Sequence, residues 1–219
     1  MKKLILFSAL LFSLAANAQV REGRVVFTME LTGGPANDNM AAALLSNTNM
    51  TILFKNDKSL TEMVTPVYSM RTLTDSKGSL MLMDGGGEKV YTRMSKDDIE
   101  KNKPKGNAPV VVITKEKKKI LGYDCTKATV SMNNAKGKPS TTVIWFTEKI
   151  QASAVAGLIN TDALTQIKGL PLMVEMDQGP IKSKFVAKEV SLKPVPDASF
   201  NLSTAGYTEK KPTPQIKRP

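Results

Sequence analysis

Few side chains in this sequence could carry out covalent or metal chemistry. The 219 residues include no histidine and a single cysteine, Cys125. A cysteine or serine nucleophile usually needs a neighbouring base, most often histidine. The sequence therefore excludes Cys-His and Ser-His-Asp arrangements, together with zinc sites built on histidine. Cys125 stands among apolar residues of a strand-like run, which predicts a buried structural thiol that has no disulfide partner in the chain.

Asp97 and Asp98 are adjacent carboxylates that could form an acid/base pair or hold a metal ion. Adjacent residues of a helix point in different directions, which separates the two groups. They also follow Ser95 at the start of a helical pattern, where acidic side chains are favoured by the helix dipole. We therefore interpret them as helix-start residues.

Met81 and Met83 place two thioethers on one side of a predicted strand, and soft thioethers can bind Cu(I). Without a histidine or a second cysteine nearby, this would be a poor copper site. Gly85, Gly86 and Gly87 are followed by no Lys-Ser/Thr pair and join two strands, which is typical of a hairpin turn and not of a phosphate-binding loop. The sequence thus predicts no cofactor, no metal and no enzymatic activity.

Methionine is the unusual residue, since twelve occur while aromatic residues make up only 5% of the chain. Methionine is flexible and polarizable, and it suits surfaces that adapt to varied apolar ligands. A cavity for acyl chains would use such side chains. The alternative is that methionine replaces leucine in an ordinary core.

The elements expected around these residues are mostly strands. Residues 24–31 alternate so that Val25, Phe27, Met29 and Leu31 share one face. Tight turns separate the short runs that follow, which indicates a meander of hairpins and a mostly antiparallel sheet. These runs are at 50–54, 59–65, 68–73, 79–84 and 89–94.

The second half continues in the same way, with five more strand-like runs: 110–114, 119–132, 141–147, 169–177 and 181–192. Lys115–Lys119 is most simply a solvated turn. Short helices are expected at three places. One covers 38–45 with Met40 and Leu44 on its apolar face, one begins after Ser95, and one or two lie within 149–168.

The first eighteen residues predict export. Lys2 and Lys3 precede an apolar run, and Ala16-Asn17-Ala18 forms a small-x-small site, so we expect signal cleavage between Ala18 and Gln19. The apolar run is too short to span a membrane, and no later window approaches a spanning helix. We expect a signal peptide at 1–18, a single domain at 19–207 and a disordered, basic, Pro-rich tail at 208–219.

The formal net charge of +11 favours anionic partners. Nucleic acid is not expected, because an exported chain with few aromatic residues lacks a platform for stacking bases. An anionic membrane surface is one interpretation of the charge, and simple solubility is the other.

Five segments in order resemble the DUF4412 family of exported proteins, and related elements occur in GLPGLI-type exported proteins. The segments are YTRM (91–94), KILGYDCTKATV (119–130), VIWFTEKI (143–150), KGLPLMVEM (168–176) and FVAKEVSLKPVPDASFNLSTAGY (185–207). The signal peptide is similar to those of Bacteroidota. The tail after Tyr207 departs from the family pattern.

The family is similar to the LolA/LolB-like periplasmic lipoprotein carriers. The resemblance implies an α+β fold: a strongly curved antiparallel sheet, or half-barrel, with two or three short helices on its concave side over an apolar cavity. The hairpin meander expected from the residues agrees with this fold. The family has no established catalytic residues to place on this chain.

The sequence therefore predicts a periplasmic or envelope protein that holds a lipid, an acyl chain or a lipoprotein in an apolar half-barrel cavity. The alternative is an envelope structural or protein-interaction module without a small ligand. The residues expected to line the cavity are Met40, Leu44, Trp145, Leu172, Val174 and Met176.

Overall fold

The structure is a computed structural model that describes residues 20–32, 48–101, 108–133, 139–150, 161–177 and 182–212. The cleavage site expected at Ala18 and Gln19 lies outside these residues, as does the helix expected to carry Met40 and Leu44. Both stay predictions.

The described residues form one sheet of twelve strands in the order β12-β6-β5-β4-β3-β2-β1-β11-β10-β9-β8-β7. All neighbours are antiparallel except β12 and β6, which are parallel. The sheet is not closed, because β12 and β7 stand at its two ends. The strands are β1 (Glu22–Thr32), β2 (Asn49–Lys55), β3 (Lys58–Val64), β4 (Tyr68–Asp75), β5 (Gly78–Gly85), β6 (Glu88–Ser95), β7 (Val110–Ile120), β8 (Tyr123–Asn133), β9 (Pro139–Thr147), β10 (Leu170–Asp177), β11 (Lys182–Ser191) and β12 (Thr208–Glu209).

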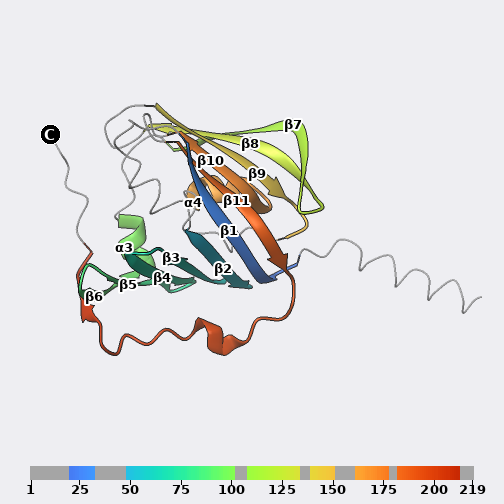
Figure 1. Cartoon of the computed structure of the whole chain (residues 1–219). Coiled ribbons are helices and arrows are strands. Elements are labelled where there is room, and N and C mark those ends of the chain that lie inside the picture. Colours follow the sequence, from blue (N-terminus) through green and yellow to red (C-terminus); the bar gives the residue numbers. More distant parts are fainter. Residues whose placement is uncertain are drawn as a thin grey trace, which may run out of the picture.

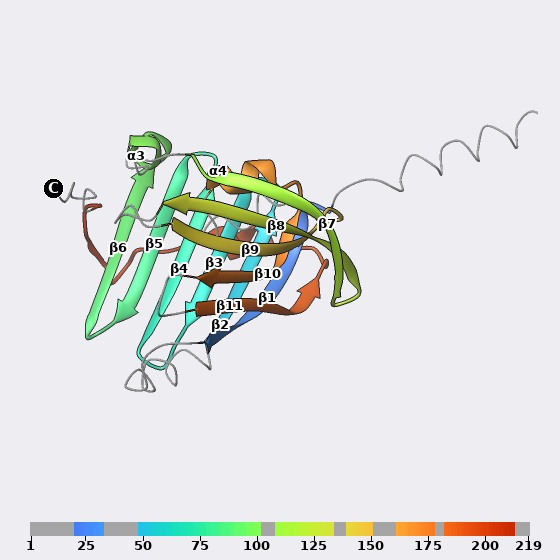
Figure 2. The same ribbon diagram turned by 90° about the horizontal axis from the view of Figure 1, so that it is seen from above.

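The first strand sits in the middle of the sheet, where it joins two sets of hairpins. β1 pairs with β2 on one side and with β11 on the other. The sheet bends around these central strands, so that β7–β10 form an upper layer above β2–β6 (Figure 1). Seen from above, the strands of the upper layer cross those of the lower layer (Figure 2). This open, folded-over sheet agrees with the mostly antiparallel curved sheet that the sequence predicts.

The main core draws its side chains from both layers. Alternation along β1 buries Val25, Phe27 and Met29, as predicted from the period of two. They belong to one cluster with residues of the upper layer, such as Ile144 and Phe146. Packing between the two layers therefore holds the folded-over sheet together.

The described residues include two short α-helices and a 3₁₀ turn: α3 (Lys96–Lys101), α4 (Thr161–Gln166) and η4 (Asp197–Phe200). At the start of α3, the Asp98 amide donates to Ser95 Oγ at 3.1 Å, and the Ser95 amide donates back to Asp98 Oδ2 at 3.1 Å. The Ser95 hydroxyl also donates to Asp98 Oδ2 at 2.6 Å, and this hydrogen bond, followed by the one from the Ser95 amide, lowers the pKa of the Asp98 carboxyl. The helix-start interpretation is confirmed. In α4, Ala163 is fully buried in the main core cluster, and Ile167 just beyond the helix joins it there.

Two expectations about the region around residues 115–122 were wrong. Lys115–Lys119 is not a turn, because β7 continues through it to Ile120. Residues 115–119 are all exposed, and β7 is an edge strand, where lysine side chains commonly guard against pairing with another chain. The run from 119 to 132 is not one strand either, because the chain turns at Leu121 and Gly122, with φ of 50° and 81°. Both residues adopt the left-handed conformation of a tight hairpin turn. Leucine is uncommon in this conformation, so Leu121 did not indicate a turn in the sequence.

The first residues of the segment expected to be a disordered tail form a short strand. Thr208 and Glu209 form β12 beside β6. The next residue strengthens this contact, since the Lys210 amide donates to the Tyr91 carbonyl at 2.8 Å and its ammonium pairs with Glu88 at 2.7 Å. Residues 213–219 lie outside the described part of the chain.

Candidate functional site

The structure does not gather the expected cavity residues on one open surface. Leu172 and Val174 are fully buried in the main core. Residues opposite one another on neighbouring strands share a face. Val174 pairs with Ile144 and Met173 pairs with Trp145, so Trp145 lies on the other face from Val174 and the partly buried Met176. The three β10 residues share a face, and Trp145 does not join them.

Trp145 instead carries two lysines over its indole ring. Lys118 Nζ lies 5.4 Å from the ring centroid, and Lys127 Nζ lies 6.0 Å from it. Lys118 Nζ also donates to Met173 Sδ at 3.9 Å. A cation above an indole face is attracted by the π electrons. Trp145 therefore anchors basic side chains of β7 and β8.

A different set of apolar side chains does line up on one face of the lower layer. Met50, Met63, Met70 and Met83 are successive cross-strand partners on β2, β3, β4 and β5. We call them the methionine row. The row continues the core, because Met50 also pairs with Phe27 of β1. Its face, which we call the inner face, is therefore the one that looks toward the upper layer.

Exposure increases along the methionine row. Met50 is only 3% exposed, Met63 and Met70 are partly buried, and Met83 is 40% exposed. Tyr68 lies on the same face and donates its hydroxyl hydrogen to Met63 Sδ at 3.5 Å. Its cross-strand partner is Gly85, where a Cβ atom would approach the Tyr68 Cβ to 2.5 Å. The row is a continuous apolar strip from the core to the surface.

The inner face of β3–β6 is also nearly free of charge. Its remaining positions hold hydroxyl, small or apolar side chains, and the one charged residue is Glu88 at the start of β6. Two further methionines, Met81 and Met94, stand on this face beside Thr72 and Ser79 respectively. The inner face can therefore contact an apolar ligand without leaving a charge desolvated.

The opposite face of the same layer, the outer face, is built differently. Leu53, Leu60, Leu73 and Leu80 are successive partners on β2–β5, and we call them the leucine row. Residues 192–207, the C-terminal segment, run along this side of the layer (Figure 1). The side chains of this segment that pack against the row are Val195, Phe200 and Leu202.

Polar contacts hold the C-terminal segment in place. Lys55 Nζ donates to the Val195 carbonyl at 3.1 Å and pairs with Asp197 at 3.1 Å. Further along, Arg71 donates to the Tyr207 hydroxyl at 3.4 Å, and Lys89 lies 5.9 Å from the Tyr207 ring centroid. The outer face therefore has a partner supplied by the chain itself.

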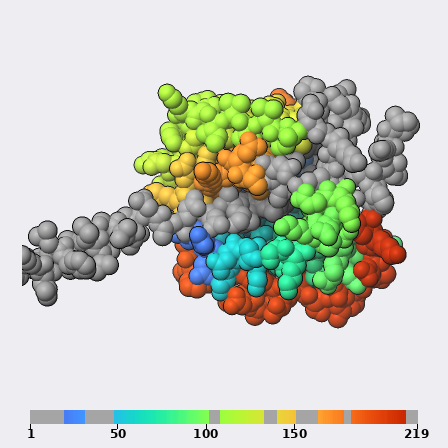
Figure 3. Space-filling model, turned by 180° about the vertical axis from the view of Figure 1, so that it is seen from behind, coloured from blue at the N-terminus to red at the C-terminus, as the bar shows by residue number. Residues whose placement is uncertain are grey.

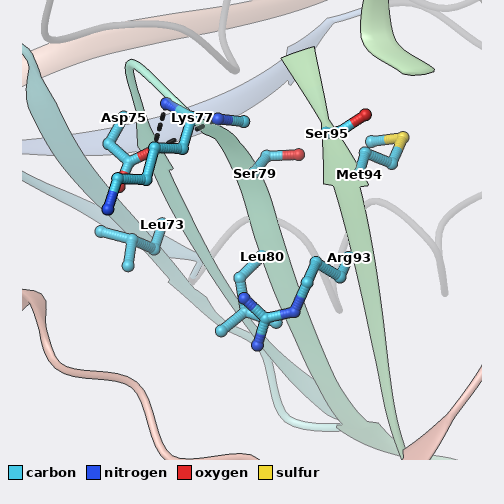
Figure 4. Close-up of a pocket in the computed structure, with 9 residues that line it drawn as sticks. Leu73, Asp75, Lys77, Ser79, Leu80, Arg93, Met94 and Ser95 are labelled. Atoms are coloured by element: carbon cyan, nitrogen blue, oxygen red, sulfur yellow. Dashed lines mark hydrogen bonds between the residues drawn. The ribbon is translucent and has the colours of Figure 1, made fainter. Parts of the chain in front are cut away.

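A small pocket of about 250 Å³ opens at the end of the leucine row, beside the β4–β5 turn (Figure 4). Leu73, Leu80 and Arg93 line it from the outer face. The Asp75 carboxylate at its rim accepts the amide hydrogens of Lys77 at 2.8 Å and Gly78 at 3.2 Å, so it stabilises the turn. None of the residues expected from the sequence to line a cavity belongs to this pocket.

The structure also decides the role of the only cysteine. Cys125 is fully buried and unpaired. Burial raises the pKa of its thiol to about 11, so the thiol is neutral at physiological pH. The expectation of a structural thiol is confirmed. Within the described residues, no three histidine, cysteine or acidic side chains come together as metal ligands.

The methionine row was missed at the sequence level, although a signal for it exists. Two-residue turns at Asn56-Asp57 and Ser76-Lys77 fix the register of their hairpins. Met50 and Met63 are equidistant from the first turn, and Met70 and Met83 are equidistant from the second. Treating the turns as register constraints would have aligned these pairs.

No helix among the described residues is long and apolar enough to cross a membrane. No family model and no curated protein matches the sequence, so the resemblance to DUF4412 stays a prediction.

Three solved structures overlap with the chain at low similarity. PNGF-II shares 17% identity at a TM-score of 0.47 over 87% of this chain, which spans only 31% of that protein. Lipoprotein LppX of Mycobacterium tuberculosis shares 12% identity over 79% of this chain and 88% of its own, with a TM-score of 0.33. LprF from Mycobacterium bovis shares 12% identity over 81% and 88%, with a TM-score of 0.35. Overlaps at these scores do not establish a shared fold or function.

Proposed function

We propose that this protein is an exported binding protein of the cell envelope, most simply of the periplasm, that holds the acyl chain of a lipid or lipoprotein on its inner face. The observation that carries the proposal is the methionine row, which runs from buried Met50 to exposed Met83 on an almost uncharged face. Each methylene group that an acyl chain buries there would contribute about 0.8 kcal/mol.

The side-chain chemistry of the row suits chains of different shape. Methionine has three rotatable bonds and a polarizable sulfur, so Met63, Met70 and Met83 can adjust to saturated and kinked chains. Upper-layer strands and α4 would close the concave side over the chain, as the predicted half-barrel requires. The net positive charge would favour anionic headgroups near the opening.

The first experiment is to purify the mature protein, extract it with organic solvent and record its native mass before and after extraction. We expect a co-purified acyl compound, and we expect a fluorescent fatty acid to bind with a stoichiometry of one. A clean mass before extraction, combined with no uptake of the fluorescent fatty acid, would sink the proposal.

Paired variants test whether the ligand binds on the inner face. The double variant Met70→Gln, Met83→Gln puts amides beneath the acyl chain, and each unpaired amide that is buried costs roughly 1–3 kcal/mol. Two such amides together cost roughly 2–6 kcal/mol, so we expect binding of the fluorescent fatty acid to weaken by about 30-fold or more. Val64→Gln with Val67→Gln is the matched control, because Val64 points to the outer face and both valines are exposed. Equal losses in the two double variants would place the ligand elsewhere.

A further inference from the structure

Strand β7 is one free end of the sheet. Within the described residues its only strand partner is β8. A free edge leaves a row of backbone N–H and C=O groups without a strand partner, and proteins usually guard such edges with charged side chains or bulges. The first residues of β7 lack this guard, because Val110, Val112 and Ile113 are 61%, 54% and 50% exposed.

Exposed apolar side chains are concentrated at this edge. Eight large hydrophobic side chains of the described residues are exposed, and half of them belong to the β7–β8 hairpin: Val110, Val112, Ile113 and Leu121. In the space-filling view the yellow-green residues of this hairpin make up the upper surface of the molecule (Figure 3). This concentration marks a surface built to contact something else.

The second half of β7 is strongly basic. Four lysines and one acidic residue lie between Lys115 and Ile120. Glu116 already pairs with Lys127 at 2.9 Å. A register shift between Ile113 and Lys117 separates this basic half from the apolar half. A partner with an apolar stretch and an acidic stretch would complement the strand along its length.

The exposure pattern favours an added strand over a flat membrane surface. Val112 and Ile113 are neighbours on the strand, so their side chains point to opposite faces of the sheet. Both side chains are at least half exposed, so both faces of β7 are accessible at this point. A bilayer surface would contact one face, whereas an extended peptide contacts the backbone edge together with side chains on both faces.

We propose that β7 binds an extended segment of a partner protein as an additional antiparallel or parallel strand, with apolar residues beside Val110–Ile113 and acidic residues beside Lys115–Lys119. The site is remote in the strand order from the methionine row, because five strands (β1, β11, β10, β9 and β8) separate β7 from β2. This inference is independent of the lipid-binding proposal, and either can fail alone.

The test uses the mature protein labelled with ¹⁵N and two synthetic peptides of about ten residues, the length of a long strand. In one peptide the N-terminal half alternates Val and Thr and the C-terminal half alternates Glu and Thr. The other peptide has the acidic half first, so that the two peptides together cover both strand directions. We expect one of them to bind and to slow hydrogen exchange at β7 amides between Val110 and Ile113. A peptide with Lys in place of Glu should bind at least about tenfold more weakly.

Variants separate the edge from general stickiness. Val110→Lys with Val112→Lys adds guarding charges at exposed positions and should weaken peptide binding by about tenfold or more. Val64→Lys with Val67→Lys, on the lower layer, should leave it unchanged. Failure of both peptides to protect β7 would overturn the proposal. A second result would also overturn it: the protein binds phosphatidylglycerol vesicles, the β7 variant abolishes that binding, and the peptides do not compete with the vesicles. The partner would then be a membrane surface.

Discussion

The two faces of the lower layer carry parallel rows of apolar side chains on the same strands. On the outer face the leucine row meets Val195, Phe200 and Leu202 of the C-terminal segment. On the inner face the methionine row ends in Met83, which is 40% exposed. The outer face of this layer therefore presents leucine to the C-terminal segment of the same chain. The inner face presents methionine, and its last methionine is exposed to solvent.

The difference follows from the two side chains. Leucine is branched and has few rotamers, which suits a contact that is always the same. Methionine adapts its shape and specifies its packing poorly, which is a disadvantage in a fixed core but an advantage for ligands of varied shape. We infer that the outer face stabilises the fold and that the inner face is available for binding.

The largest effect should come from breaking the outer contact. Phe200 is 4% exposed and packs in the cluster of Leu60 and Val195. Phe200→Ala should lower the free energy of unfolding by about 3–5 kcal/mol, because it removes buried contacts and leaves a cavity. Urea unfolding of the two proteins measures the change.

The counterpart on the inner face is Met83→Ala, which should cost less than about 1 kcal/mol because Met83 is already exposed. If the two variants lost similar amounts of stability, both faces would serve the fold equally and the contrast between them would fail.

Replacing Met63, Met70 and Met83 by Leu should change stability little but should change how evenly the protein binds fatty acids of different shape. Each change conserves volume approximately and should shift the free energy of unfolding by less than about 1.5 kcal/mol. Across saturated and cis-unsaturated fatty acids of several lengths, the spread of dissociation constants should widen by about tenfold, because leucine adapts less. An unchanged spread would mean that adaptability is not the reason for methionine here.

The smallest effect concerns the margin of the layer, where Lys210 ties β12 to β6. Its hydrogen bond and its charge hold the pKa of Glu88 below the ordinary value of 4.5. Since the folded-state pKa is lowered, the pair adds stability above about pH 4.5 and loses it as the pH falls through the folded-state pKa. In Lys210→Ala, an NMR titration should show the Glu88 pKa returning toward its ordinary value.

Asp98 is the internal control for that titration, because its pKa is lowered chiefly by the hydrogen bonds from Ser95 and not by Lys210. If Glu88 kept its lowered pKa without Lys210, the ion pair would not be what holds β12 at the edge.

The sequence predicted local features well where one residue type governs the geometry. Ser95 and Asp98 cap α3 as expected, and alternation along β1 buries Val25, Phe27 and Met29. Tight turns around Asn56, Lys77 and Gly86 gave the hairpins. Each of these features depends on residues within a few positions of one another, so a single sequence contains the information.

Features that depend on the pairing of distant strands were not predicted. Trp145 was grouped with Val174, but the β9–β10 register with its shift between Pro171 and Met173 puts them on opposite faces. A one-residue change of register exchanges the two faces, and no nearby residue announces the bulge. For the same reason the covering of the leucine row by Phe200 could not be seen, since the segments lie far apart in the chain.

The most direct test of the proposed binding face is to label the methionine methyl groups with ¹³C and to titrate the protein lacking residues 1–18 with a fatty acid. The account predicts that the methyl signals of Met63, Met70 and Met83 shift together and saturate at one equivalent. It also predicts that Met173, buried beside Trp145 and Lys118 on the other side of the upper layer, does not shift. Shifts at Met173 with none along the methionine row, or no shifts at all, would contradict the claim that the inner face binds an acyl chain.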